Sequence, residues 1–229
     1  MKILSLDTSS EYMSLGLKID EDFYSININA GQTHSEIVLP EIKKLLEGHQ
    51  LTTKDLDAIA FGRGPGSFTG IRIACGIAYG LGYGASIPVI GVNNLLALAE
   101  SSGKNKVISA IDARMGEIYL SAYTKESKIF SKPIIEGVYK PDELPQLKES
   151  GWTLIGNAIE TYKKEMKDHF DQQINDLVDG PYEVVESISR LAIPFIKNKV
   201  FELIHAEPVY LRNKVAFTTE ERKALNAIY

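Results

Sequence analysis

The sequence predicts an α/β protein built from two related lobes. Strand-like and helical segments alternate along the chain, an order that places helices against the faces of sheets. The strand ILSLDTSS leads into MSLGL, and later VISAIDAR leads into EIYLSAY, so a strand, an acidic turn and a second strand occur twice. The 229 residues, of which 44% are hydrophobic, suffice for a substantial core. We place the lobes at residues 1–103 and 104–229.

The first lobe is expected to open with three strands, at residues 3–6, 13–19 and 23–28. The short turns between them favour an antiparallel meander. The segment THSEIVLPEIKKLLEG has the apolar spacing of a helix, and Thr33 with Glu36 predicts a capping box at its start. Pro40 weakens this prediction, because proline inside a helix removes one hydrogen bond and forces a kink.

The remaining elements alternate in the same way through both lobes. Further strands are expected to begin at residues 58, 88, 107, 117 and 152. Helices are expected from Thr69, at residues 93–103 and at residues 182–199. The last helix is amphipathic, and Pro194 is expected to interrupt it.

Charge and cysteine content limit the possible classes of function. The net charge is −5 and lysines and arginines do not form a run, so unaided binding of tRNA is disfavoured, whereas work on nucleic acid within a complex stays open. The lone Cys75 cannot form an internal disulfide, which suits a reducing cytoplasm. The sequence offers neither a signal peptide nor the roughly 18 apolar residues of a membrane span. We therefore expect a soluble cytoplasmic protein without a membrane partner.

A glycine-rich turn, FGRGPGSFTG, precedes the helix that begins at Thr69. Nine of the 18 glycines lie within residues 62–91. The turn is not a Walker A loop, because Ile71 stands where lysine is expected, and it does not match the dinucleotide-binding pattern. Exposed amides at a helix start can still bind an anion. The alternative is that Gly64, Pro65 and Gly66 only permit a tight turn.

Small residues in the following helix recur at every fourth position. The spacing produces three rows: Gly76, Gly80 and Gly84; Ala74, Ala78 and Gly82; Ile73, Ile77 and Leu81. Glycine inside a helix costs about 1 kcal/mol relative to alanine, so regular glycines suggest the close approach of another backbone. That backbone could belong to a partner or to another part of the same chain.

Polar residues at the end of the first strand form a second candidate site. A carboxylate with two hydroxyls, in Asp7, Thr8 and Ser9, could hold a hydrated magnesium ion or a phosphate, with Asp112 as its counterpart. The alternative is an Asx-type turn, in which short polar side chains bond to nearby backbone.

The sequence does not assemble a catalytic constellation. The four histidines, at positions 34, 49, 169 and 205, are far apart and include no HxxxH pair, which argues against a zinc centre. A nucleophile with a base and an orienting acid cannot be assembled either. We predict no catalytic residue and no metal ligand in this chain.

Taken together, ILSLDTSS, RGPGSFTGIRIACGIAYGL, IDARMGEIY and PVYLRNKVA resemble the bacterial TsaB (YeaZ) family over the whole chain. The resemblance implies the two-lobed actin/Hsp70/sugar-kinase (ASKHA) fold, with mixed sheets flanked by helices. It also implies work with the related protein TsaD and the ATPase TsaE, which transfer a threonylcarbamoyl group to adenosine N6 of tRNAs that decode ANN codons. In that system TsaD holds the metal through an HxxxH pair, so the present chain would be its non-catalytic partner.

The resemblance also implies where partners and ligands bind. Heterodimers and homodimers would form through Gly70, Ile73, Ala74, Ile77, Ala78, Gly80, Leu81 and Gly84. Any nucleotide binding would be an inherited trace that uses Asp7, Thr8, Ser9, Gly66 or Asp112. We expect no cofactor in the isolated chain, ATP and magnesium used by the complex, and tRNA reached only through it. The alternative is an ATP-dependent small-molecule kinase of the same fold, with Asp7 as metal anchor.

Overall fold

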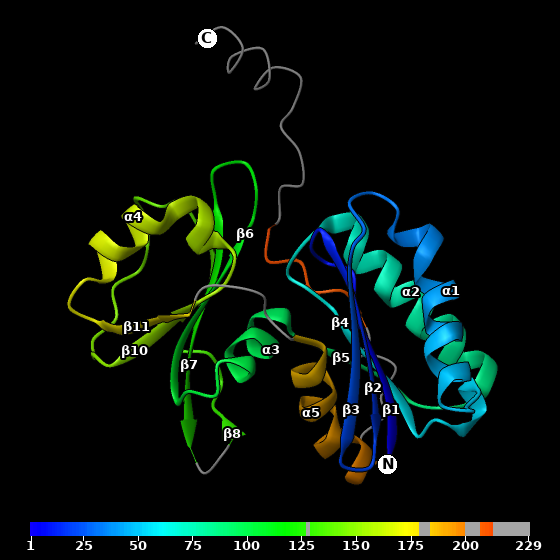
Figure 1. The fold of residues 1–229 in the computed structure, drawn as a ribbon. Helices are drawn as coiled ribbons and strands as arrows, with labels where there is room; N and C mark the ends of the chain where they lie inside the picture. The colour runs from blue at the N-terminus through cyan, green and yellow to red at the C-terminus, as the bar shows by residue number, and fades with distance from the viewer. Residues whose placement is uncertain (127–128, 179–183, 200–206, 213–229) are drawn as a thin grey trace, which may run out of the picture.

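The computed structural model describes residues 1–126, 129–178, 184–199 and 207–212, which form two lobes that each contain a sheet flanked by helices (Figure 1). The first sheet has the order β3-β2-β1-β4-β5. The second has the order β11-β10-β6-β7-β8, and β9 also pairs with β7. The predicted α/β class with two mixed sheets is confirmed.

The first lobe contains an antiparallel meander followed by two parallel strands. Its strands are β1 (Lys2–Asp7), β2 (Tyr12–Ile19), β3 (Asp22–Asn29), β4 (Ala58–Gly62) and β5 (Val89–Val92). Its helices are α1 (His34–Gly48), the short 3-10 helix η1 (Thr53–Asp55) and α2 (Phe68–Ala85). Alternation along β1 builds two cores, because Leu4 and Leu6 pack with residues of α1 and α2 whereas Ile3 packs on the opposite face.

The second lobe repeats this topology. Its strands are β6 (Lys106–Asp112), β7 (Ile118–Glu126), β8 (Ile129–Phe130), β9 (Ile135–Tyr139), β10 (Trp152–Ile155) and β11 (Ile174–Val178). The order β9-β7-β6-β10-β11 corresponds to β3-β2-β1-β4-β5, with antiparallel and parallel pairs in the same places. Asp7 and Asp112 are therefore equivalent, since each is the last residue of the central strand of its lobe.

Helices α3 (Asn94–Ser101) and α5 (Val184–Lys197) lie between the two sheets (Figure 1). Helix α3 packs on β6 and β7 and also on α5. Helix α5 packs on the first sheet, where Ile188 and Ala192 join the same cluster as Ile3. The expected boundary after residue 103 thus separates the two sheets, but α5 returns from the second half of the sequence to the first lobe.

The helix ends and interruptions differ in places from the expectations. The capping box of Thr33 and Glu36 is wrong, because the Thr33 hydroxyl donates to the Ala30 carbonyl at 2.9 Å and does not cap α1. Pro194 lies inside α5 without ending it, so the expected interruption is also wrong. Helix α4 (Ala158–Phe170) and strands β8, β9 and β11 were not predicted from the sequence.

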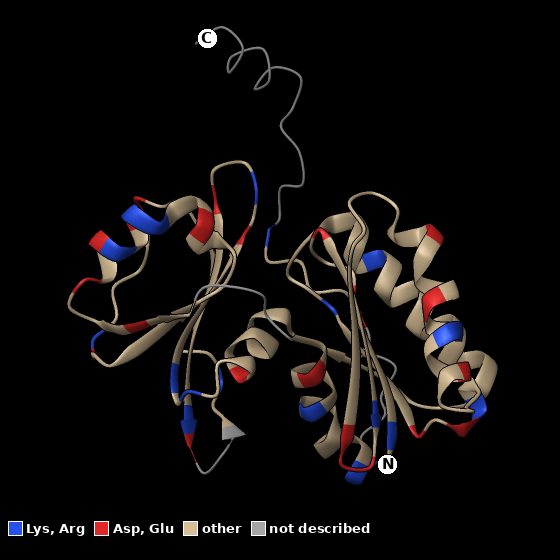
Figure 2. Cartoon of the chain, viewed as in Figure 1, with Lys and Arg blue, Asp and Glu red and all other residues tan. Residues whose placement is uncertain are grey.

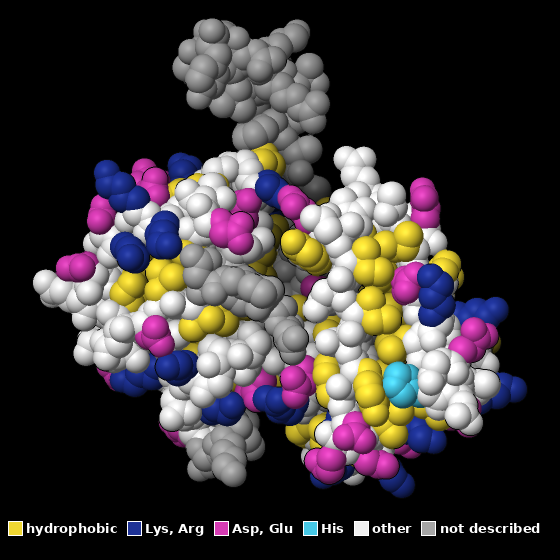
Figure 3. All heavy atoms as spheres, in the orientation of Figure 1, with side chains coloured by type: hydrophobic (Ala, Val, Ile, Leu, Met, Phe, Trp, Pro, Cys, Tyr) yellow, Lys and Arg dark blue, Asp and Glu magenta, His cyan; other side chains and the backbone are white. Residues whose placement is uncertain are grey.

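Charged side chains of both signs are interspersed on both lobes, and α2 carries Arg72 as its one charged residue (Figure 2). The visible face of the first lobe gathers hydrophobic side chains between β3 and α1 (Figure 3). Tyr24 of β3 and His49, which follows α1, have ring centroids 4.1 Å apart and ring planes tilted by 48°. Among the described helices, none has both the length and the apolar run needed to cross a membrane.

Candidate functional site

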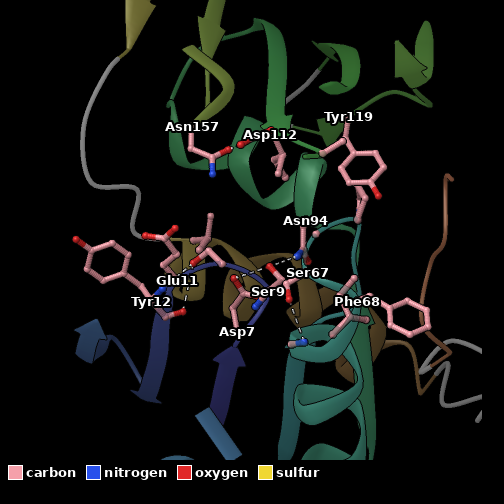
Figure 4. Close-up of a pocket in the computed structure, with 18 of the residues that line it drawn as sticks. Asp7, Ser9, Glu11, Tyr12, Ser67, Phe68, Asn94, Asp112, Tyr119 and Asn157 are labelled. Carbon is pink, nitrogen blue, oxygen red and sulfur yellow. Dashed lines mark hydrogen bonds between the residues drawn. The ribbon is translucent and has the colours of Figure 1, made fainter. Parts of the chain in front are cut away.

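A cleft of about 1460 Å³ separates the lobes, at the end where the two central strands finish (Figure 4). The first lobe contributes Asp7, Ser9 and Asn94 to its lining, and the second contributes Asp112 and Asn157. The cleft is also lined by four aromatic side chains: Tyr12, Phe68, Tyr119 and Tyr210. The cleft is larger than most small-molecule pockets, which span roughly 300–1,000 Å³, and its lining mixes polar with apolar side chains.

A chain of hydrogen bonds fixes the end of β1. Ser9 donates its N–H to Asp7 Oδ1 at 3.2 Å and its hydroxyl to Asp7 Oδ2 at 3.1 Å. Asn94 Nδ2 donates to Ser9 Oγ at 2.7 Å, and Gly64 N donates to Asn94 Oδ1 at 3.2 Å. The Asx-type turn is confirmed, and it is tied to the start of α3 and to the glycine turn.

Asp7 is buried, with 6% of its surface exposed. Burial raises the pKa of its carboxyl, because the charged form loses hydration, while hydrogen bonds from Ser9 and the neighbouring His34 limit the rise. His34, the first residue of α1, also lines the cleft. Within the described part of the chain its Nε2 is buried without a hydrogen-bond partner.

The glycine turn and the start of α2 pack closely against the residues that follow Asp7. A Cβ on Gly70 would lie 1.8 Å from the Thr8 carbonyl oxygen, and a Cβ on Gly66 would lie 2.7 Å from Ser9 Cβ. The Thr8 hydroxyl donates to the Gly70 carbonyl at 2.6 Å, and Ser67 N donates to the Ser9 carbonyl at 2.8 Å. These glycines therefore permit close backbone contact within the chain, as the tight-turn alternative requires.

The second lobe forms a matching turn at the end of β6. Arg114 N donates to Asp112 Oδ1 at 2.8 Å, and its guanidinium lies 3.3 Å from Asp112 Oδ2. Asp112 N in turn donates to Asn157 Oδ1 at 2.9 Å. A Cβ on Gly156 would lie 1.9 Å from the Ala110 carbonyl oxygen, so this glycine packs against β6. Arg114 also reaches across the cleft to Glu11 at 3.0 Å.

The proposed nucleotide residues are brought together only in part. Asp7, Ser9, Gly66 and Asp112 line the cleft, whereas Thr8 is fully buried beneath α2 and cannot contact a ligand there. The side-chain oxygens of Asp7, Ser9 and Asp112 already have hydrogen-bond partners in this chain. A magnesium ion would have little access to the buried Asp7 and would compete with the Arg114 guanidinium for Asp112. The described residues also include no cluster of three or more potential metal ligands.

Helix α2 has one face turned into the first lobe. Ala74 and Ala78 are 0% exposed and Gly70 is buried, because they pack against strands and turns of this chain. A Cβ on Gly82 would lie 2.2 Å from Val89 Cγ2. The assignment of Gly70, Ala74 and Ala78 to a partner interface is therefore corrected, since their side chains have no surface to offer.

The opposite face of α2 is open. A Cβ on Gly76, Gly80 or Gly84 would meet no atom of the described residues within 4 Å, apart from the local helix backbone. Tyr83 beside this row is 90% exposed. We call the row and its flanking residues the glycine face, which comprises Ile73, Gly76, Ile77, Gly80, Leu81, Tyr83 and Gly84.

Sequence reasoning missed several residues of the cleft. Asn94 follows a parallel strand, and the carboxyl end of such a strand is where ligand sites form, so its position carried a usable signal. His34 and Arg212 gave none, because only the folded chain brings them to the cleft.

Comparison with known proteins identifies the family. The model for "TsaD: tRNA N6-adenosine threonylcarbamoyltransferase" matches residues 28–218. The tRNA threonylcarbamoyladenosine biosynthesis protein TsaB of Escherichia coli (strain K12) is 35% identical to this chain, over 95% of this chain and 97% of the relative. The protein of the same name from Haemophilus influenzae is 33% identical, over 95% of this chain and 96% of the relative. YeaZ from Pseudomonas aeruginosa superposes with a TM-score of 0.76 at 29% identity, covering 92% of this chain and 99% of that chain. A second structure, described as similar to peptidase YEAZ from the same organism, gives 0.77 at 30% identity with the same coverage. The chain therefore belongs to the TsaB (YeaZ) family and has its two-lobed, actin-like ASKHA fold.

Proposed function

We propose that this chain is the non-catalytic partner subunit of a tRNA N6-adenosine threonylcarbamoyltransferase complex. Its partners are a TsaD-type catalytic subunit and a TsaE-type ATPase, and ATP and magnesium are used by the complex. tRNA is reached only through that complex, in the cytoplasm. Support comes from the names of its relatives and from the match to the family model of the transferase itself.

The observation that carries this proposal is the glycine face of α2. Each glycine in a helix costs roughly 0.5–1 kcal/mol relative to alanine. Among the described residues, nothing outside the local helix backbone lies within 4 Å of a Cβ placed on Gly76, Gly80 or Gly84, so packing against the described part of the chain does not explain these glycines. The face is also free of charge, which lowers the cost of removing it from water. A partner helix that approaches its backbone closely accounts for both properties, and a second copy of this chain could use the same face.

We assign the transfer reaction to the partner because this chain lacks the groups that the reaction needs. The sequence contains no HxxxH pair, and Asp7 and Asp112 are held in turns of their own lobes. A subunit that has lost the reacting groups can still shape and stabilise the subunit that keeps them.

The proposal is tested by mixing the purified chain with the TsaD-type subunit encoded in the same genome. Size-exclusion chromatography with light scattering should show a complex of the two. Transfer to tRNA, assayed with the ATPase, ATP and magnesium present, should require both subunits. If the two proteins elute separately and the TsaD-type subunit is fully active alone, the proposal is wrong.

The second candidate is an ATP-dependent small-molecule kinase of the same fold. The volume of the cleft and the position of Asp7 within it favour this candidate. Against it stand the burial of Asp7 and the hydrogen bonds from Ser9, because a metal ion would have little access to this carboxylate.

A further inference from the structure

Residues 207–212 lie between the two lobes, where Figure 1 shows them in orange-red. We call this segment the C-terminal strap. Val209 N donates to the Arg63 carbonyl at 2.7 Å, and a Cβ on Gly64 would lie 2.7 Å from the Val209 carbonyl oxygen. At the start of the strap, Glu207 lies near Cys75 of α2: burial raises the pKa of that thiol and the Glu207 carboxylate raises it further. The strap is thus attached to the first lobe through the glycine turn and α2.

Aromatic and cationic side chains attach the middle of the strap to α2. The rings of Tyr210 and Phe68 have centroids 5.7 Å apart. The Arg72 guanidinium lies 3.4 Å from the centroid of Phe68 and 5.5 Å from that of Tyr210. Arg72 precedes Gly76 by one helical turn, so it lies at the edge of the glycine face.

The end of the strap is attached to the second lobe. The Arg212 guanidinium donates to the Arg114 carbonyl at 3.2 Å and to Met115 Sδ at 3.3 Å, and it pairs with the Glu117 carboxylate. It also lies 5.8 Å from the centroid of the Tyr119 ring. The Arg212 side chain is only 13% exposed, so water screens these charge-assisted bonds less than it would at the surface.

We propose that the C-terminal strap couples the glycine face of α2 to the separation of the two lobes. Within these six residues, Tyr210 contacts Arg72 at the edge of that face, and Arg212 binds the β6–β7 turn on the other side of the cleft. Opening the lobes must stretch or release the strap, and releasing it frees Tyr210 from Phe68 and Arg72. By linkage, a partner seated on the glycine face that favours the attached strap also favours the closed cleft. The identity of that partner rests on the proposed function; the attachment of the strap does not.

The first test uses the full chain alone and measures amide hydrogen exchange by mass spectrometry. Arg212→Ala should accelerate exchange at Val209 roughly tenfold, because a hydrogen-bonded charge pair that holds the strap is lost. Glu117→Ala should do the same from the other lobe and serves if the first variant folds poorly. The double variant should add little to either single variant. Lys164→Ala, at an exposed position on α4, is the control because it removes a charge without touching the strap or the cleft; it should leave exchange at Val209 unchanged.

The second test adds the TsaD-type subunit. Its binding should slow exchange at Val209 in the wild-type chain, and Arg212→Ala should weaken its binding by about tenfold, in proportion to the lost protection. If exchange at Val209 is equally fast in the wild type and in both single variants, the claim that Arg212 and Glu117 hold the strap is wrong. If Arg212→Ala accelerates exchange at Val209 but leaves the affinity for the TsaD-type subunit unchanged, the proposed coupling is wrong. Failure of the wild-type proteins to associate contradicts the proposed function instead and leaves the first test standing.

Discussion

Gly80 and Gly82 lie two residues apart on α2 and meet opposite surroundings. A Cβ on Gly82 would lie 2.2 Å from Val89 Cγ2, whereas a Cβ on Gly80 would meet no neighbouring element within 4 Å in the described part of the chain. The fold of this chain therefore requires the glycine at position 82 and does not require the one at position 80.

This contrast predicts opposite effects of the same substitution on stability. Gly80→Ala should raise the free energy of unfolding by about 1 kcal/mol, because alanine is the better helix former. Gly82→Ala should lower it by roughly 1–3 kcal/mol, because the added methyl group overpacks the contact with Val89. Urea denaturation at concentrations where the chain is monomeric measures both. If Gly80→Ala were destabilising, position 80 would serve the chain's own fold and the open-face account would lose its basis.

The buried hydroxyl of Thr8 should contribute measurably to stability. It donates to the Gly70 carbonyl at 2.6 Å and holds the start of α2 against β1. Thr8→Val keeps the shape but removes the donor, and it should lower the free energy of unfolding by about 1–3 kcal/mol. Thr161→Val, at an exposed position on α4, is the control and should change little. Equal losses for the two variants would show that the hydrogen bond is not responsible.

Asp7 should make stability depend on pH in a defined direction. Burial raises the pKa of its carboxyl above the ordinary value of 3.8, so the native chain holds this proton more tightly than the unfolded chain does. The contribution of Asp7 is therefore lost as pH rises from that value through the raised pKa. Asp7→Asn keeps an acceptor for the Ser9 N–H and should be more stable than the wild type at about pH 7, with the difference shrinking towards about pH 4. Denaturation curves across this range measure it; an advantage independent of pH would contradict the assignment.

The isolated chain should bind Mg-ATP weakly or not at all. Asp7 is buried and bonded to Ser9, and Asp112 pairs with Arg114, so a metal ion would have little access to the first carboxylate and would compete with a guanidinium for the second. Isothermal titration calorimetry should show no binding in the micromolar range, which corresponds to about −8 kcal/mol. Micromolar binding together with turnover of ATP would support the kinase alternative instead.

Much of the fold could be predicted because it depends on local patterns. Apolar runs that end in acidic turns marked β1 and β6, and their repetition revealed two related lobes. Helix α4 was not predicted because its segment is rich in charged residues and its apolar residues, such as Met166 and Phe170, are few and widely spaced. The packing of α5 against the first lobe is a contact between distant parts of the sequence, so local sequence patterns could not predict it.

The candidate site was predictable to a smaller extent. Spacing revealed the rows of small residues on α2, but rows of alanine and of glycine look alike until the neighbouring strands are in place. The structure decides that Ala74 and Ala78 face inward and that Gly76 and Gly80 face outward. The strap depends on contacts between residues far apart in the sequence, such as Val209 with Arg63 and Arg212 with Glu117, and the sequence does not indicate such contacts.

The central claim, that the glycine face of α2 receives a partner's backbone, is tested most directly by one measurement of affinity. Gly80→Trp fills the open space without touching the core, so it should remain folded by circular dichroism yet bind the TsaD-type subunit at least about a hundredfold more weakly in calorimetry, a loss of about 2.7 kcal/mol. Lys164→Trp adds the same side chain to an exposed position on α4 and should bind as the wild type does. Native affinity in the folded Gly80→Trp variant would contradict the claim.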